Sequence, residues 1–296
     1  MHFCGAQLSR TITGDYHVNN TDYIKKLKPI TIDKSRTPDQ SVTIAERRRL
    51  KGLLGSLAWP ANQTSAHLQC SVSILQGSTG ENAKVEALTE ANRLLRFTKA
   101  NNDVGILVRK FDCHISKVTF VVLTDAAWAV RPDGSSQGGY IILMASDKVV
   151  YNTASPYVVV DWRSFKLTCV SRSSLSCEAQ AATSGVDALA FAKCFWSLCL
   201  NSYLDPRSDY TMQVIGTSAL VIDAKALYDA AQKEHVHSFN DKRTGIEVMV
   251  LKERMKASDT IWRWVSSERQ YADGLTKFSA RQLLADRLRH GIITLV

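Results

Sequence analysis

The sequence predicts an α/β fold in which a mixed β-sheet is flanked by helices and preceded by a smaller, mostly helical region. Two observations lead to this fold class. From Gly105 onward the chain reads first as a series of strands and then as alternating helices and strands, the order expected of a mixed sheet covered by helices. Before Gly105, two stretches carry apolar residues at helical spacing. We therefore divide the chain into residues 1–104 and a larger domain of residues 105–296.

The N-terminal region is expected to open with short strands and then to form two helices, at about 44–57 and about 83–98. The second helix carries its apolar residues on one face: Leu88, Ala91, Leu94 and Leu95. The segment between the helices contains Pro60 and ends in a loop rich in Gly, Ser and Asn, so we expect at most one more short helix there.

The larger domain begins with a series of strand-like stretches, which read GILVRKF, KVTFVVLTD, GGYIILMA and KVVYNTA, and Asp133-Gly134 and Asp147-Lys148 supply turn signals. The simplest interpretation of this series is three consecutive antiparallel strands. A long helix with a face of small residues follows at about 175–201. An apolar run that ends at Asp223 and passes into AKALYDAAQ predicts a buried strand followed by a helix. A helix at about 244–256, the strand TIWRWV and two short helices complete the chain.

Composition and charge limit the class of protein. With 296 residues and 45% hydrophobic residues, the chain can bury a sizeable core. No apolar run is long enough to span a bilayer and the N-terminus lacks the pattern of a secretory signal, so we expect an intracellular protein, cytoplasmic or nuclear, with no membrane partner. A formal charge of +9 favours a polyanionic partner such as nucleic acid.

Four carboxylates stand where strand ends and helix starts would direct them to one point. They are Asp125 in VVLTDAAWA, Glu178 in SSLSCEAQAA, Asp223 in LVIDAKALYDA and Asp273 in QYADGLTK. We expect Asp125 and Asp223 at the ends of adjacent strands and Glu178 in the first turn of a helix that crosses the sheet. Carboxylates without His or Cys suit the hard ions Mg²⁺ and Mn²⁺, and one of them can bridge two ions roughly 3.5–4 Å apart. The chemistry that such a site performs is phosphodiester hydrolysis.

Each acid taken alone has an ordinary explanation, because Asp and Glu are common at helix starts and strand ends. Only their joint placement indicates a site. Trp262 and Trp264, which alternate along a predicted strand, are expected to pack in the core.

Four stretches of the chain resemble successive blocks of the ribonuclease H domain of copia-type LTR retrotransposon Pol polyproteins. In order, they read TDAAWA, VDWRSFKLTCVSRSSLSCEAQAA, VIDAKALYDA and IWRWVSSERQYADGLTK. Two earlier stretches, LLGSLAWPANQTSAHLQCSVSILQG and ANRLLRFTKANNDVGILV, resemble the region between the reverse transcriptase palm and that domain.

The resemblance implies a ribonuclease H-like mixed sheet of five strands, with residues 1–104 a remnant of the reverse transcriptase C-terminal or connector region. It also implies an endonuclease that hydrolyses the RNA strand of RNA–DNA hybrids with two Mg²⁺ (or Mn²⁺) ions, and a reverse transcriptase as a partner. The metal ligands carried over by position are Asp125, as the bridging ligand, with Glu178, Asp223 and Asp273. Nucleic-acid contacts are expected from basic residues near these acids: Arg172, Lys225 and Lys277.

Departures from the family pattern leave an alternative open. Gln180 stands where the family has a further acid, the Tyr-x-Asp-Asp signature of the polymerase is absent, and VSSERQ replaces the His-bearing loop of cellular ribonucleases H. The alternative is a catalytically inactive or repurposed retroelement fragment that binds nucleic acid. A DDE-type recombinase on the same fold is disfavoured, because no Glu stands at the helical position beyond Asp223 that resemblance to that family would require.

Overall fold

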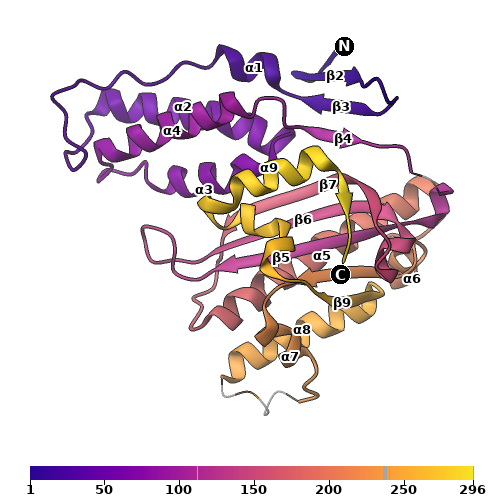
Figure 1. Ribbon diagram of the computed structural model, residues 1–296. Helices are drawn as coiled ribbons and strands as arrows, with labels where there is room; N and C mark the ends of the chain where they lie inside the picture. The colour runs from indigo at the N-terminus through magenta and orange to yellow at the C-terminus, as the bar shows by residue number, and fades with distance from the viewer. Residues whose placement is uncertain (112, 236–238, 240, 296) are drawn as a thin grey trace.

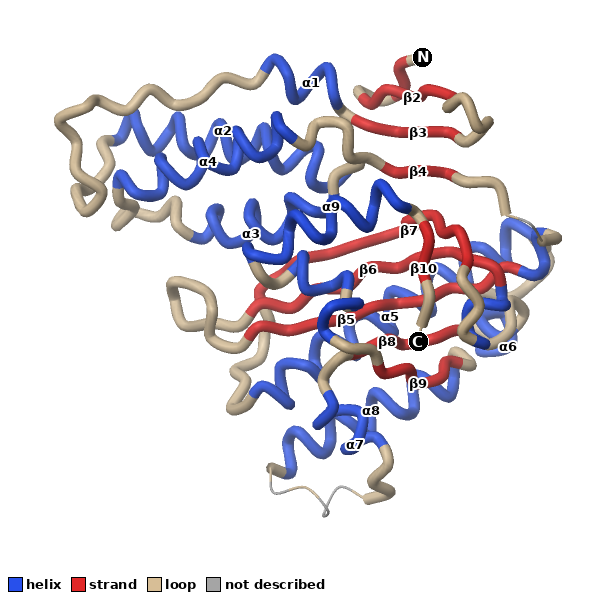
Figure 2. Tube along the Cα trace, viewed as in Figure 1, coloured by secondary structure: helices blue, strands red, loops and turns tan. Residues whose placement is uncertain are grey.

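The computed structural model describes residues 1–111, 113–235, 239 and 241–295, with the backbone alone at Phe3. Its centre is a mixed sheet with helices on both faces, and the N-terminal region packs along one side of this body (Figures 1 and 2).

The central sheet has the strand order β10-β7-β6-β5-β8-β9. The strands are β5 (Val118–Ala127), β6 (Gln137–Ser146), β7 (Ser155–Lys166), β8 (Ser218–Ile222), β9 (Thr260–Trp264) and the two-residue β10 (Ile292–Ile293). Strands β5, β6 and β7 form an antiparallel meander, whereas β8 runs parallel to β5 and β9 runs parallel to β8. This is the predicted ribonuclease H-like mixed sheet of five strands, and β10 extends its β7 edge.

Side chains alternate between the two faces of the sheet, as the period of two along a strand requires. Phe120 and Val122 of β5 pack with α5 (Ser174–Leu200), α7 (Lys225–Ala231) and α8 (Lys242–Ala257). Val121 and Leu123 pack on the opposite face, against the 3-10 turn η6 (Tyr271–Leu275) and helix α9 (Arg281–His290). Both faces of the central strands are therefore buried, which explains why these strands read as continuous apolar runs.

The N-terminal region consists of a small sheet and a group of helices with its own core. The sheet has the order β1-β2-β3-β4, from His2–Phe3, Ala6–Arg10, Tyr16–Asn19 and Ile106–Val108. The helices are α1 (Thr21–Lys26), α2 (Ile44–Gln63), η1 (Ala66–Leu68), α3 (Gln69–Gly77) and α4 (Val85–Ala100). A capping box begins α2, in which the Thr43 side chain accepts from Glu46 N and the Glu46 side chain accepts from Thr43 N. Leu54, Leu57 and Leu88 are buried between these helices.

Two sequence-based assignments are corrected. KVVYNTA is not a strand: η3 (Asp147–Tyr151) begins with Lys148 N donating to Ser146 Oγ and ends at Asn152, which has a left-handed φ of 65°. Its apolar residues Val149 and Val150 are buried in a turn rather than in a ladder, so hydrophobicity alone misled the assignment. The third antiparallel strand is β7 instead, while the GILVRKF segment supplies β4 to the N-terminal sheet.

Helix α2 is also longer than expected, because it continues past Pro60 to Gln63. A proline breaks a helix by lacking an N–H and by crowding the preceding turn. Here it lies in the last turn, where its carbonyl oxygen accepts from Thr64 N and Ser65 N.

The N-terminal region packs directly on β7 and α9. Trp162 Nε1 donates to Ala61 O over 2.8 Å, and Arg289 pairs with Asp103 at 2.7 Å. The division into two domains at 104/105 stays a prediction.

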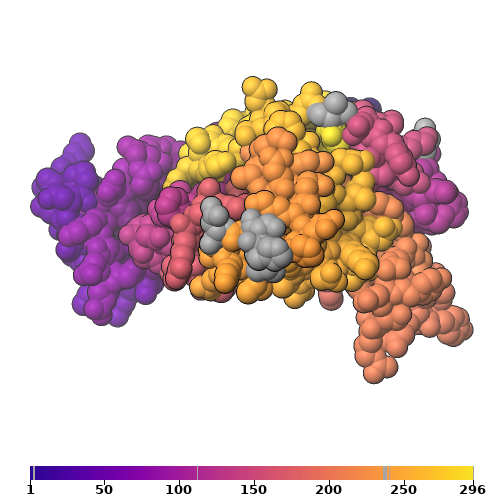
Figure 3. All heavy atoms as spheres, turned by 90° about the horizontal axis from the view of Figure 1, so that it is seen from below, coloured from indigo at the N-terminus to yellow at the C-terminus, as the bar shows by residue number. Residues whose placement is uncertain are grey.

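The end of α5 and the segment leading to α6 (Asp209–Gln213) project from the body when the molecule is seen from below (Figure 3). Large apolar side chains are exposed here, including Phe191 at 75% and Phe195 at 59%. Within the described residues, no helix combines the length and the apolar character needed to cross a membrane.

Candidate active site

Three of the four predicted acids meet at one edge of the central sheet. Asp125 lies near the end of β5, Asp223 directly follows β8, and Glu178 extends from α5. Each offers a carboxylate oxygen, and these oxygens lie within 4.8 Å of one another. Because β5 and β8 are adjacent and parallel, their carboxyl ends reach the same edge, which is where such sheets place their ligands.

Glu178 is brought to this edge by a close approach of α5 to the sheet. The helix begins at Ser174 after the capping residue Ser173, so Glu178 is its fifth residue and lies just beyond the expected first turn. Two turns further along, a Cβ on Gly185 would lie 2.5 Å from Thr124 Cγ2 of β5. The absence of a side chain at Gly185 therefore sets the distance between helix and sheet that lets Glu178 reach Asp125.

Asp273 reaches the same region from η6. This turn lies against β6 at Gly139, the residue paired with Asp125, where an added Cβ would be 2.6 Å from Leu275 Cβ. Asp273 is not in the group of three, but Lys277 joins it to that group. Lys277 Nζ lies 2.7 Å from Asp273 Oδ1 and 3.4 Å from Asp125 Oδ2.

Burial strongly perturbs these carboxyl groups. Desolvation raises the pKa of Asp125 to about 7, with Lys277 opposing the shift and Asp273 adding to it. Desolvation also raises the pKa of Glu178 to about 9, and the negative charges of Asp125 and Asp223 contribute in the same direction. Burial raises the pKa of Asp273 as well. Although burial opposes the charge of Lys277, the neighbouring carboxylates raise the pKa of this ammonium.

The donor set fits a hard divalent cation. Glu178 is 9% exposed, and its Oε2 atom is buried without a hydrogen-bond partner among the described residues. A buried carboxyl oxygen without a partner is costly, and three carboxyl groups that share one small volume cannot all be ionised unless a positive charge lies between them. A cation bound by Asp125, Glu178 and Asp223 would relieve both penalties.

Neighbouring polar groups orient the acids, and the sequence did not single them out. Ser267 Oγ donates to Asp223 Oδ2 over 2.7 Å, and Trp264 Nε1 donates to Asp223 O over 2.9 Å. Thr276 Oγ1 donates to Asp125 Oδ2. In the sequence, only their position near Asp273 could have pointed to these two residues. Ser267 lies in the VSSERQ string before Asp273, and Thr276 lies three residues after it.

Both tryptophans were expected to pack in the core, which is wrong for Trp264, whereas Trp262 is partly buried against it. Trp264 is 45% exposed beside Asp223, and Trp262 packs against the apolar core on the α5 side of the sheet.

The three basic residues predicted to contact nucleic acid lie in different settings. Lys277 belongs to the acid cluster. Lys225 Nζ pairs with Asp229 at 2.9 Å on the surface of α7, and Arg172 is exposed just before α5. Their contacts with nucleic acid stay predictions.

A buried polar chain connects helix α3 to the segment that carries Asp273. Gln137 Nε2 donates to Ser73 Oγ of α3 over 3.2 Å and to Ser164 Oγ of β7 over 2.7 Å. Ser164 Oγ in turn donates to Leu275 O of η6. Because Gln137 is fully buried, the N-terminal region is coupled to the position of η6.

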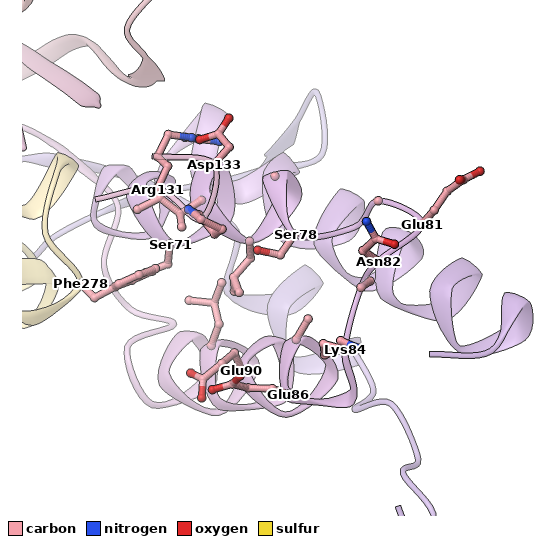
Figure 4. Close-up of a pocket in the computed structure, with 18 of the residues that line it drawn as sticks. Ser71, Ser78, Glu81, Asn82, Lys84, Glu86, Glu90, Arg131, Asp133 and Phe278 are labelled. Atoms are coloured by element: carbon pink, nitrogen blue, oxygen red, sulfur yellow. The ribbon is translucent and has the colours of Figure 1, made fainter. Parts of the chain in front are cut away.

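A separate pocket of about 840 Å³ lies between α3, α4 and the loop after β5 (Figure 4). Glu86 and Glu90 line it from α4, and Arg131 and Asp133 line it from the loop. None of the four predicted acids lines this pocket, so the cluster and the pocket are two distinct places.

The sheet has the predicted ribonuclease H-like fold, and the carboxylate cluster at its edge offers the oxygen donors that a divalent cation prefers. Neither a protein-family model nor a curated protein matches the chain. Among solved structures, the chain is similar to RNase H1 from the archaeon Halobacterium salinarum, at 14% identity and a TM-score of 0.35, over 55% of this chain and 97% of that one. It is similar to the RNase H domain of prototype foamy virus at 18% identity and a TM-score of 0.30, over 59% of this chain and 94% of that one. A foamy viral protease-reverse transcriptase in complex with double-stranded DNA matches 90% of this chain and 38% of its own, at 11% identity and a TM-score of 0.42.

Proposed function

We propose that this protein is a ribonuclease H-like endonuclease that hydrolyses the RNA strand of RNA–DNA hybrids, and that it derives from a copia-type retrotransposon Pol polyprotein. The observation that supports the activity is the meeting of Asp125, Glu178 and Asp223 within 4.8 Å on a ribonuclease H-like sheet. The origin rests on the sequence blocks that resemble that family. In this proposal, residues 1–104 are the remnant of the connector region.

The residues assigned to divalent ions are Asp125, Glu178, Asp223 and Asp273, with Asp125 shared between two Mg²⁺ or Mn²⁺ ions. Bound there, the ions would supply Lewis acidity for phosphodiester hydrolysis. The protein's own groups hold the carboxylates in place. Thr276 fixes the rotamer of Asp125 and Ser267 that of Asp223 by hydrogen bonds to their Oδ2 atoms.

Selection of the RNA strand requires contacts to 2′-hydroxyl groups, since the deep groove of such a duplex cannot be read by side chains. The formal charge of +9 supports binding to the phosphate backbone through counterion release. We therefore expect hybrid affinity to fall steeply as salt rises.

The activity is tested by incubating the full chain with Mg²⁺ and a hybrid labelled on its RNA strand. We expect short RNA products from the wild type and no products when EDTA is added. Asp125→Asn should lower the cleavage rate by at least about 100-fold. The matched control is Asp229→Asn, because Asp229 is an exposed acid paired with Lys225 and should retain full activity. An uncut hybrid, or cleavage that survives Asp125→Asn, contradicts the proposal, and binding without cleavage supports the inactive alternative.

A further inference from the structure

Lys277 occupies a defined place inside the carboxylate cluster. It lies two residues after the end of η6, and its backbone N–H donates to Asp273 O over 2.8 Å. Its ammonium lies 2.7 Å from Asp273 Oδ1 and 3.4 Å from Asp125 Oδ2. The side chains of Asp125 and Asp273 are only 2% and 13% exposed, so their charges need a partner within the protein. The lysine ammonium supplies that partner.

The two sides of the cluster therefore differ in how their charge is balanced. On the side of Asp273, the carboxylates already share the Lys277 ammonium. On the side of Glu178, Oε2 is buried without a hydrogen-bond partner among the described residues, and a carboxylate oxygen of Glu178 lies within 4.8 Å of oxygens from Asp125 and Asp223. A cation that enters beside Glu178 meets the unpartnered Oε2 atom, whereas one that enters beside Asp273 must first displace Lys277.

We propose that Lys277 stands in for a second divalent cation when no nucleic acid is bound, so that the free protein takes up one ion, held by Asp125, Glu178 and Asp223. This inference deepens the proposed function and rests on it. The Lys277 side chain is 41% exposed, so its ammonium can leave the acids for solvent or for a phosphodiester oxygen without unpacking the core. Lys277 is then a positioning residue that sets how many ions the site holds.

The test counts Mn²⁺ ions bound to the full chain without nucleic acid, by isothermal titration calorimetry and by Mn²⁺ electron paramagnetic resonance. We expect one tightly bound Mn²⁺ in the wild type and two in Lys277→Met, with spin coupling between the pair. Lys277→Arg, which keeps the positive charge, should bind one. Lys256→Met, which removes a lysine exposed on α8, should also bind one.

The possible failures are distinguishable. Two ions in the wild type, or one ion in a folded Lys277→Met protein, overturns the role of Lys277 and leaves the carboxylate site intact. The wild-type count tests the inference even if Lys277→Met does not fold. No bound Mn²⁺ in the wild type, or an ion that persists unchanged in Glu178→Gln, overturns the proposed function together with this inference.

Discussion

Glu178 is a buried residue whose protonation state depends on whether a cation is bound. Burial raises its pKa to about 9, so in the ion-free protein the carboxyl holds a proton at pH 7. A divalent ion must release that proton to bind. The residue is thus neutral and tolerated without an ion, and it becomes a charged ligand when an ion arrives.

We predict that Glu178→Gln leaves the ion-free protein nearly as stable as the wild type at pH 7, because glutamine replaces a protonated carboxyl of similar size. Mn²⁺ at about 100 times its dissociation constant should stabilise the wild type by about 2.7 kcal/mol and the variant by far less. Thermal unfolding with EDTA or Mn²⁺ measures both effects. Glu253→Gln, on the exposed side of α8, is the control, and equal stabilisation of Glu178→Gln and wild type contradicts the prediction.

Lys193 is a second buried charge, remote from the acids. It is fully buried in α5, and its Nζ donates to Gly216 O over 2.8 Å and to Ser258 O over 2.5 Å. Burial lowers the pKa of Lys193 to about 8, although Asp259 opposes the shift. The lysine thereby ties α5 to the segments that lead into β8 and β9.

We predict a pH signature for Lys193. Its pKa in the folded protein lies below the ordinary value of 10.5, so between about pH 8 and 10.5 the unfolded chain binds more protons. Lys193 therefore adds to stability as pH rises through this window, by about 1–3 kcal/mol. Urea unfolding from pH 7 to 10 should show this rise in the wild type and in the exposed control Lys256→Met, but not in Lys193→Met. The same dependence of unfolding free energy on pH in all three proteins would refute this role of Lys193.

At the scale of elements, the contact between α5 and the sheet decides whether the acids meet. Gly185 allows the close approach, and Thr124 of β5 lies directly opposite it. A helix displaced from the sheet would carry Glu178 away from Asp125, although no ligand had been changed.

We predict that Gly185→Ala destabilises the protein by about 1–3 kcal/mol and weakens Mn²⁺ binding, because its Cβ would lie 2.5 Å from Thr124 Cγ2. Adding Thr124→Ser deletes that methyl group and should recover part of both losses. Gly55→Ala in α2 is the matched control, since an added Cβ there has no neighbour within 4 Å, and it should be neutral or slightly stabilising. Equal effects of Gly185→Ala and Gly55→Ala would contradict the argument.

Some helices and strands could be predicted from the sequence, and others could not. Apolar and small residues at helical spacing predicted α4 and α5, and apolar, strand-like runs predicted β5, β6, β8 and β9, near their observed bounds. Hydrophobicity failed at η3, where Val149 and Val150 are buried in a turn, and at β7, whose pairing is set by β6 rather than by local pattern. The carboxylates were expected from their places at element ends. Lys277 among them, and the hydrogen bonds from Ser267 and Thr276, depend on how η5 (Ser267–Arg269) and η6 dock, which no local spacing encodes.

At the scale of the whole molecule, the N-terminal region has a core of its own and also contributes residues to the core on one face of the central sheet. Ala66 and Val104 are buried in the same cluster as Trp162 and Leu288. The polar chain from Ser73 through Gln137 to Ser164 crosses the same boundary. Separate unfolding of the two regions would expose apolar surface and leave buried polar groups without partners.

We therefore predict a single cooperative unfolding transition, with coincident urea curves from far-ultraviolet circular dichroism and tryptophan fluorescence. Trp162→Phe removes the hydrogen bond to Ala61 O and should lower stability by about 1–2 kcal/mol while the two curves remain coincident. Two resolved transitions in the wild type would mean that the two regions fold independently.

In the proposed function, carboxylates distant in sequence share a divalent cation, and anomalous diffraction from a crystal grown with Mn²⁺ tests this directly. We predict an anomalous peak within about 2.0–2.6 Å of carboxylate oxygens from Asp125, Glu178 and Asp223. A map without a peak at these residues, or one in which the Glu178 carboxylate points away from Asp125, would contradict it.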